Sequence, residues 1–419
     1  MMSMDTNNLR INIARLLDRL DQLAQIGKID GDGVCRLALT DEDKAGRDLV
    51  CRWMHDLGLD VSVDRVGNVI GTRAGTEDGP VVLTGSHIDT VGTGGRYDGT
   101  LGVLAGLEVI ASMNDMDMQT TLPLGVGFFT NEEGVRFQPD MMGSMVHQGH
   151  LPLDGMLRSK DRDGATLDGE LNRIGYAGDV DVDTMRAAAF VELHVEQGPV
   201  LEQRGITIGA VDSVQGLLWK QITFSGTSNH AGTTPMSLRH DCGYAAGEIA
   251  TFGRHLAIDM GEPQVVTVGT ILMEPNLINV IAKQSIITVD LRNTDLTLLR
   301  EAEARLDAHA NNIAASEGLD VEIETLARYD PTPFDQRVVD LITDNAMTLG
   351  CSVRQMPSGA GHDAQAFAPN CPTAMIFVPS VGGISHNVAE YTEADDLEAG
   401  TNVLLHTLVS LANRETDLS

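Results

Sequence analysis

The sequence predicts a layered α/β domain that is interrupted by a smaller, inserted α+β domain. Three observations predict this organisation. Short strand-like runs alternate with helix-like segments over residues 1–212. Residues 213–328 instead follow the order strand, helix, strand, strand, helix, strand, which is typical of a compact α+β unit. The alternation of helix and strand resumes over residues 329–419, so we expect one domain formed by both outer segments.

The clearest elements of the first segment surround a glycine-rich stretch. Residues 81–85 form a β-branched run that ends at a polar cluster, which predicts a buried strand leading into a loop. Apolar residues recur at helical spacing over 99–113, and the apolar run 123–130 predicts a second strand that ends in acidic residues. Ligands of α/β domains commonly bind at the carboxyl ends of such strands.

The inserted domain is expected to contain four strands and two helices in the order given above. Its expected strands are 217–224, 264–273, 285–292 and 320–325, and its expected helices are 241–254 and 296–315. The second helix is expected to end near Gly318, since glycine commonly follows the last turn of a helix. The final segment is expected to contain a helix at 337–349, a strand at 374–378 and a helix at 395–412.

Composition excludes several classes of protein. The chain of 419 residues carries a formal net charge of −31, which argues against binding to nucleic acid or to an anionic membrane surface. It has no run of about 18 apolar residues that would predict a membrane span, and residues 1–15 lack the basic-then-apolar order of a secretory signal. The five cysteines are scattered without a CxxC pair, so neither a disulfide framework nor a structural zinc knuckle is expected. We therefore expect a cytoplasmic protein.

Five short segments concentrate histidine and acidic residues beside glycine. They are GSHID (85–89), GRYDG (95–99), TNEEG (130–134), ELHVEQG (192–198) and GISH (383–386). Imidazole and carboxylate groups are the ligands that zinc prefers, and manganese or cobalt also accept them. All five segments lie in the outer α/β part, where they follow or adjoin predicted strands.

The spacing of these residues suggests roles within a metal site. If His87 binds a metal, Asp89 is placed to accept the other ring N–H of that histidine. Asp98 lies at a glycine-rich helix start, where a carboxylate can approach a neighbouring strand end. Glu132 and Glu133 are adjacent, so one can bind metal while the other faces a water molecule. Taken singly, a His-x-Asp pair is more often a surface hydrogen bond than a metal site, and a Glu-Glu pair is usually a solvated acidic face. Only the combination of the motifs is informative.

The chain resembles a known enzyme family through nearly its whole length, from about residue 10 to residue 412. The segments that carry the resemblance are GSHIDTVGTGGRYDGTLGVLAGLEVI, TNEEGVRF, ELHVEQGPVLE, SNHAGTTPM and SGAGHDA. They are similar to bacterial dinuclear-metal amidohydrolases that act on N-carbamoyl compounds, which include N-carbamoyl-L-amino acid hydrolases, β-ureidopropionases and allantoate amidohydrolases. The resemblance implies a catalytic domain like that of di-zinc exopeptidases, with a mixed sheet flanked by helices, and an inserted domain for dimerisation and substrate clamping.

The resemblance also implies two divalent metal ions per subunit. Zinc is the first expectation, with manganese, cobalt and nickel as alternatives that the same ligands accept. By position in the matching motifs, His87 and His194 would be the terminal ligands of one ion and Glu133 and His386 those of the other, with Asp98 as the bridging carboxylate. Without the resemblance, His194 could instead be interpreted as a hydrogen-bonded histidine of the core.

Further roles follow from the resemblance alone. Glu132 matches the general base, and Gln197 matches a glutamine that contacts the substrate. His230 matches a histidine that is contributed to the neighbouring subunit's active site to stabilise the oxyanion, which implies a homodimer. Asn279 and Arg292 match the pair that binds the α-carboxylate of the substrate, a task that suits the planar guanidinium.

Two positions stand apart from these assignments. The pair His362–Asp363 matches a family motif, but we assign it no chemical role because a glycine-rich turn before a helix explains it equally well. Val388 occupies a position where family members often have proline, a change that affects the rigidity of the loop rather than metal binding.

The expected reaction is hydrolysis of the carbamoyl C–N bond of an N-carbamoyl-L-amino acid to the amino acid, carbon dioxide and ammonia. Two alternatives use the same metals and clamp: hydrolysis of allantoate, and cleavage of an ordinary N-acyl or peptide bond. These motifs do not separate the three substrates. A binding protein that kept the fold but lost catalysis would lack a ligand or the base, whereas every such position here holds a suitable residue.

Overall fold

The computed structural model describes residues 9–182 and 187–416. Residues 1–8, part of the segment searched for a secretory signal, lie outside the described residues. The chain divides into two compact units: unit 1 is Met1–Asp212 with Pro333–Ser419, and unit 2 is Ser213–Thr332. The second boundary lies after the position 328 expected from the sequence, because strand β10 continues to Tyr329. No helix in the described part of the chain is long and apolar enough to cross a membrane.

Unit 1 is built on a mixed sheet, which has nine strands among the described residues. The strands are β1 (Asp60–Val63), β2 (Val69–Arg73), β3 (Val81–His87), β4 (Leu124–Phe129), β5 (Ala187–Val195), β6 (Ile208–Val214), β11 (Thr332–Pro333), β12 (Val353–Ser358) and β13 (Thr373–Val378). Their order is β1-β2-β4-β3-β5-β13-β6-β11, with β12 paired to β6. The central strands β4, β3, β5 and β13 are parallel and almost fully buried, as expected for strands covered on both faces.

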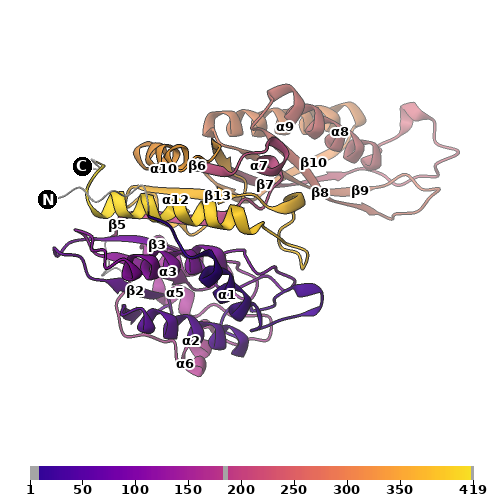
Figure 1. The fold of residues 1–419 in the computed structure, drawn as a ribbon. Helices are drawn as coiled ribbons and strands as arrows, with labels where there is room; N and C mark the ends of the chain where they lie inside the picture. The colour runs from indigo at the N-terminus through magenta and orange to yellow at the C-terminus, as the bar shows by residue number, and fades with distance from the viewer. Residues whose placement is uncertain (1–8, 183–186, 417–419) are drawn as a thin grey trace. The chain divides into compact units, whose positions relative to one another are not determined.

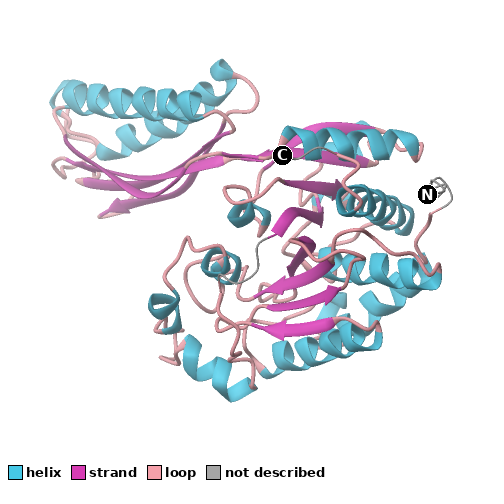
Figure 2. Ribbon diagram, turned by 90° about the vertical axis from the view of Figure 1, so that its left-hand side faces the viewer, coloured by secondary structure: helices cyan, strands magenta, loops and turns pink. Residues whose placement is uncertain are grey.

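Helices flank this sheet (Figure 2). They are α1 (Ile13–Ala24), α2 (Asp41–Asp56), α3 (Thr100–Asp115), α4 (Met142–His147), α5 (Leu153–Leu157), α6 (Leu167–Ile174), α7 (Val200–Arg204), α10 (Gln336–Thr348), α11 (Ala364–Phe367) and α12 (Ala394–Ala412). Helix α3 packs on β3 and β5 and is covered by α1 and α12, so almost its whole circumference is buried. Its sequence is accordingly apolar all round. Helix α12 lies along β13 and α10 (Figure 1).

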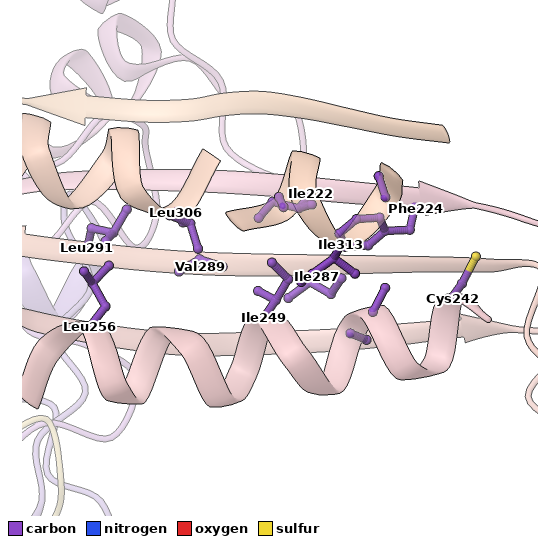
Figure 3. Close-up of a cluster of buried hydrophobic side chains, with 14 of the residues drawn as sticks. Ile222, Phe224, Cys242, Ile249, Leu256, Ile287, Val289, Leu291, Leu306 and Ile313 are labelled. Atoms are coloured by element: carbon purple, nitrogen blue, oxygen red, sulfur yellow. The ribbon is translucent and has the colours of Figure 1, made fainter. Parts of the chain in front are cut away.

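Unit 2 is a four-stranded antiparallel sheet with helices on one face (Figure 2). Its elements are β7 (Gly216–Ser225), α8 (Cys242–Met260), β8 (Val265–Glu274), β9 (Gln284–Asn293), α9 (Leu296–Glu317) and β10 (Asp320–Tyr329). Burial alternates along β9, where Ile287, Val289 and Leu291 face the helices. These side chains meet Ile249 of α8 and Leu306 of α9 in the core shown in Figure 3.

Candidate metal centre and active site

The parallel strands of unit 1 bring the expected ligands to one edge of the sheet. His87 is the last residue of β3, and His194 lies near the end of the parallel neighbour β5. Glu132 and Glu133 follow β4, the neighbour of β3 on its other side. His386 lies in the loop after β13, which is parallel to β5. The carboxyl ends of parallel strands share one sheet edge, so residues far apart in the sequence meet there.

Asp98 lies at the centre of this group. Its Oδ1 is 3.1 Å from Nε2 of His194 and 3.7 Å from Nε2 of His87. Its Oδ2 is 3.2 Å from Nε2 of His386, which in turn lies 3.4 Å from Oε2 of Glu133. The two oxygens of one carboxylate therefore face two separate sets of ligand atoms, and each set could hold a metal ion.

A glycine allows Asp98 to reach this position. Gly99 has a φ of 63°, and a Cβ atom there would lie 2.3 Å from Nε2 of His87. The backbone N–H of Gly99 also lies 3.1 Å from Nε2 of His194. The GRYDG motif thus combines a left-handed backbone with close approach to both histidines, which no larger side chain permits.

Both buried histidines have their rings oriented by backbone carbonyls. Nδ1 of His87 donates to the carbonyl oxygen of Asp89 at 2.9 Å, and Nδ1 of His194 donates to that of Val195 at 2.8 Å. When either ring is neutral, its Nε2 carries no proton and faces Asp98, which is the form that binds metal.

The expected role of the Asp89 side chain is therefore wrong in its detail. The Asp89 carboxylate lies 3.9 Å from Nδ1 of His87, because the turn after β3 presents the Asp89 carbonyl to the ring instead. Its two oxygens accept the backbone N–H groups of Glu132, at 3.3 Å, and Glu133, at 3.4 Å. Asp89 thus supports the Glu132–Glu133 turn rather than the histidine, and burial raises the pKa of Asp89 to about 7.

The adjacent residues Glu132 and Glu133 face different partners. Oε2 of Glu132 lies 3.4 Å from Nε2 of His87, whereas Glu133 faces His386. Burial raises the pKa of Glu132, and the nearby carboxylates of Asp363 and Glu133 raise it further. A carboxylate with a raised pKa is suited to accept and return a proton near neutral pH.

The histidine pKa values reflect burial opposed by Asp98. Burial lowers the pKa of His87 to about 4. Burial would also lower the pKa of His194, but its hydrogen bond to Asp98 overrides burial and raises the pKa to about 9. The pKa of Asp98 lies well below its usual range, since hydrogen bonds from His194 and His386 outweigh the effect of burial.

These side chains line a pocket whose acidic groups have no lysine or arginine among them. The lining residues are His87, Asp98, Glu132, Glu133, Asp140, His194, Gln197, Ala360, Gly361, His362 and His386. Grouped carboxylates and imidazoles without a lysine or arginine form a donor set suited to a divalent cation. Asp140, Gly361 and His386, whose side chain is 49 % exposed, are the exposed lining residues, so the pocket is open to solvent beside them.

Gln197, expected to contact the substrate, contacts the expected ligand Asp98 in this structure. Its Nε2 donates to Oδ2 of Asp98 at 3.0 Å. Its backbone N–H donates to Ser380 at 3.0 Å, and its φ of 57° is in the left-handed region. Asn131 (φ 57°) and His386 (φ 52°) share this backbone conformation, so strained residues cluster at the site.

The remaining predicted residues, His230, Asn279 and Arg292, lie in unit 2. The segments of His230 and Asn279 are paired, since the N–H of Ala231 donates to the Asn279 carbonyl at 3.0 Å. Nη2 of Arg292, on β9, lies 2.9 Å from Oδ2 of Asp290. The roles of all three residues at the substrate remain predictions.

His362, which the sequence left without a role, lines the same pocket. Its ring packs edge-on against that of His194 with centroids 4.5 Å apart. Its Nε2 lies 2.9 Å from Oγ of Ser358. A third set of possible ligand atoms belongs to Glu192, His194 and His362. The two carboxylate oxygens of Glu192, however, already accept hydrogen bonds from Ser86 and from the backbone N–H of Ala364.

Sequence reasoning missed one buried acidic group beside the site. Glu390 is 6 % exposed, and its Oε1 accepts the backbone N–H of Asp98 at 3.1 Å. The available signal was its position four residues after His386, where an acidic residue close to a histidine ligand invites a supporting role.

Comparison with known proteins found a matching family model and several similar proteins. Residues 83–410 match the family model described as peptidase family M20/M25/M40. The chain is 40 % identical to an N-carbamoyl-L-amino-acid amidohydrolase of Rhizobium meliloti, covering 97 % of this chain and 98 % of the relative. It is 36 % identical to an allantoate amidohydrolase of Escherichia coli K12, covering 94 % and 97 %. The crystal structure of an amidase of the hydantoinase/carbamoylase family from Burkholderia multivorans is 45 % identical with a TM-score of 0.95, covering 97 % and 99 %.

Proposed function

The chain belongs to peptidase family M20/M25/M40, and from this premise we propose that it hydrolyses the carbamoyl C–N bond of N-carbamoyl-L-amino acids. The products would be the amino acid, carbon dioxide and ammonia. The family match confirms the resemblance predicted from the motifs. The observation that carries the proposal is the Asp98 carboxylate, which faces His87 and His194 with one oxygen and His386 with the other.

The donor set fits two divalent metal ions. His87 and His194 would hold one ion together with Asp98, and Glu133 and His386 would hold the other together with the same carboxylate. We propose zinc first, with manganese, cobalt or nickel as alternatives, because imidazole and carboxylate accept all four. When bound, such a pair supplies a Lewis acid for the substrate carbonyl and lowers the pKa of a bound water.

Glu132 would carry the proton transfer. Its carboxylate lines the pocket beside His87, and its raised pKa suits a group that must bind and release a proton. Glu132 would accept a proton from the attacking water and return it to the leaving nitrogen, which departs as the amine of the amino acid. The remaining carbamic acid then decomposes to carbon dioxide and ammonia.

His230 is suited to donate a hydrogen bond to the developing oxyanion. Its Nδ1 accepts the backbone N–H groups of Gly232, at 3.0 Å, and Thr233, at 3.2 Å. The proton of the neutral ring must therefore reside on Nε2. Because His230 is exposed, this N–H is free to reach a substrate oxygen in the active site of a neighbouring subunit.

Arg292 and Asn279 would bind the α-carboxylate of the substrate. Arg292 is 30 % exposed on the sheet of unit 2, and its guanidinium can form paired hydrogen bonds with a carboxylate. Asp290, its present partner, would be exchanged for the substrate or would share the guanidinium with it. Gln197 would complete the substrate contacts from unit 1.

We also propose a homodimer formed through unit 2. Strand β8 is an edge strand, and it exposes the apolar side chains of Ile271, Leu272 and Met273. An exposed apolar edge invites pairing with another strand. Replacing Leu272 with Asp should convert the dimer to a monomer in light-scattering measurements; a wild-type protein that is monomeric at micromolar concentration would refute the proposal.

We propose that the enzyme acts in the cytoplasm. We also propose that its substrate is a small molecule, because the acidic composition disfavours binding to nucleic acid and to anionic membranes. Fractionation of cells that express the full chain tests the location: activity in the periplasmic or membrane fraction would contradict it.

Allantoate is the second candidate substrate, because relatives named allantoate amidohydrolases match almost the whole chain. The deciding experiment is ammonia release by metal-loaded protein from N-carbamoyl-L-amino acids, N-carbamoyl-D-amino acids, N-carbamoyl-β-alanine and allantoate. N-acetyl-L-amino acids are assayed in parallel for acetate. Chelator-sensitive activity on the L-carbamoyl compounds supports the proposal, activity on allantoate alone replaces the substrate, and acetate release alone refutes the carbamoyl assignment.

A further inference from the structure

Glu390 joins two chain segments that carry ligand residues. Its Oε1 accepts the backbone N–H groups of Tyr97 and Asp98, both at 3.1 Å. Its Oε2 lies 3.0 Å from Oγ of Ser385, the residue before His386. One buried carboxylate therefore contacts both the backbone of Asp98 and the loop of His386.

The surrounding backbone is shaped to admit this side chain. A Cβ atom at Gly95 would lie 2.3 Å from Oε1 of Glu390, so only glycine allows the carboxylate to reach the 97–98 backbone. Val388 packs on Gly33 in the same way, where an added Cβ would lie 2.4 Å from Cγ1 of Val388. The loop after His386 is thus held by Val388 on one side and by Glu390 on the other.

Holding this loop matters because of the backbone at His386. Its φ of 52° is costly for a residue with a Cβ atom, and such a conformation persists only when neighbouring contacts enforce it. The ring is also exposed at 49 %, so packing alone does not fix Nε2 of His386 at 3.2 Å from Asp98. The loop contacts must supply the remaining restraint.

The Glu390 carboxylate is buried without a basic partner among the described residues. Among the described residues, no lysine or arginine forms an ion pair with Glu390, although the side chain is 6 % exposed. Burial of an acidic group without a counter-charge is unfavourable, so its three hydrogen bonds must compensate. All three lead to residues that are ligands or their immediate neighbours.

We propose that Glu390 is a positioning residue that sets the spacing between the bridging carboxylate of Asp98 and the imidazole of His386. The inference rests on the proposed function in one respect, namely that these two groups bind metal. Glu390 itself belongs to none of the described groups that could hold a metal ion, and it does not line the pocket. It acts by fixing the backbone of Asp98 and, through Ser385, the loop of His386.

The test measures metal binding without turnover, by titrating metal-free protein with Co²⁺ against a competing chelator and recording the visible absorption of bound cobalt. Glu390→Ala should lower the affinity for the ion held by Asp98, Glu133 and His386 by about 10- to 100-fold. This is the usual effect of removing a group that orients metal ligands. Glu390→Gln should retain most of the affinity, because its amide oxygen can accept both N–H bonds. Ser385→Ala should weaken binding of the same ion less, although Ser385 Oγ also lies 3.3 Å from Oδ2 of Asp98. Glu390→Asp, whose shorter side chain cannot reach both segments, therefore provides the test if the alanine variant at 390 does not fold.

Glu108 provides a control for the loss of a buried carboxylate. It is a fully buried residue of α3 that also accepts a backbone N–H, from Asn12 at 2.9 Å, and it does not line the pocket. Unlike Glu390, it has a basic partner, since its Oε2 lies 2.7 Å from Nε of Arg15. Glu108→Ala should lower stability in urea yet leave both cobalt affinities unchanged. Wild-type affinity for both ions in Glu390→Ala, or an equal loss of affinity in Glu108→Ala, would overturn the inference.

The outcomes separate this inference from the proposed function. Wild-type protein that binds two ions but hydrolyses no compound in the panel would refute the function while leaving the role of Glu390 supported by the cobalt titration. Wild-type protein that binds no metal would overturn both.

Discussion

The carboxylate of Asp89 accepts the backbone N–H of Glu132 at 3.3 Å and thereby fixes the turn that carries the proposed base. The same carboxylate accepts the N–H of Glu133 at 3.4 Å. A residue two positions after the proposed ligand His87 thus organises two proposed functional groups that follow a different strand. In the HID segment (87–89), Asp89 therefore stabilises the Glu132–Glu133 turn in addition to orienting the His87 ring through its carbonyl.

Replacing Asp89 with Asn should damage the Glu132–Glu133 turn while sparing the His87 ring. Asparagine offers one acceptor oxygen in place of two, and the His87 N–H is received by a backbone carbonyl that the substitution keeps. We expect kcat/KM to fall about 10- to 100-fold, as for other groups that orient metal ligands. Steady-state kinetics with parallel cobalt titration would reveal the change.

The cobalt titration of this variant also distinguishes the two ions. Only the ion held through Glu133 should bind more weakly. Equal weakening of the ion held by His87 and His194 would contradict the assignment of Asp89 to the turn.

Replacing Glu132 with Gln should remove proton transfer without emptying the metal site. Glutamine has nearly the same shape but cannot take a proton from water, so we expect kcat to fall about 10²- to 10⁴-fold. Metal content, measured by elemental analysis, should equal that of the wild type. A variant that keeps wild-type kcat would exclude Glu132 as the general base.

Replacing His230 with Ala should lower kcat about 10²- to 10³-fold, which is the usual effect of losing one oxyanion donor. Because Nδ1 of His230 accepts two backbone N–H groups, the neutral ring carries its proton on Nε2, which can donate to a substrate oxygen. His240 is an exposed histidine of the same unit whose Nδ1 contacts the carbonyl of Glu317, so His240→Ala serves as the control and should behave as wild type. Equal activity of the two variants would argue against the oxyanion role.

Metal removal should lower thermal stability. The pocket holds the carboxylates of Asp98, Glu132 and Glu133 without a lysine or arginine, so an ion that binds only the folded chain relieves their repulsion. Saturation at 1,000 times Kd would stabilise the fold by about 4 kcal/mol. Calorimetry with chelator and then with added Zn²⁺ should show a lower and then a restored Tm, and a Tm insensitive to both would speak against a metal site.

The buried His406 should make stability fall in acid. Burial lowers the pKa of His406 below its ordinary value of 6.5, and its Nε2 lies 3.1 Å from the Leu9 carbonyl. Below pH 6.5 the unfolded chain therefore binds a proton that the folded chain resists, so stability is lost as the pH falls toward the folded pKa. Glutamine at this position can still donate to Leu9 but does not titrate.

The measurement compares urea unfolding of wild type and His406→Gln between pH 8 and pH 5 in the presence of chelator. The difference in unfolding free energy between the wild type and His406→Gln should be constant above pH 6.5. Below pH 6.5 the unfolding free energy of the wild type should fall relative to that of the variant. Parallel curves over the whole range would show that His406 does not titrate differently on folding.

Regular periodicity made much of the fold predictable. The strand expected at 285–292 spans Gln284–Asn293, and the helix expected at 296–315 spans Leu296–Glu317, because strict alternation and a glycine after the helix mark these elements in the sequence. Strand β12 (Val353–Ser358) escaped prediction, since its mixed burial leaves no alternation to detect. Helices α1 and α2 were likewise not predicted.

The sequence by itself determined which residue types could form the site, since His, Asp and Glu beside glycine at strand ends already specify a metal-binding chemistry. Only the tertiary structure decided which atoms meet: the Asp89 carboxylate with the backbone of Glu132, Gln197 with Asp98, and Glu390 with Tyr97. These are hydrogen bonds between side chains and segments that are distant along the chain. Local periodicity encodes which face of an element is buried, but the partner of each buried polar group is set by how the chain packs.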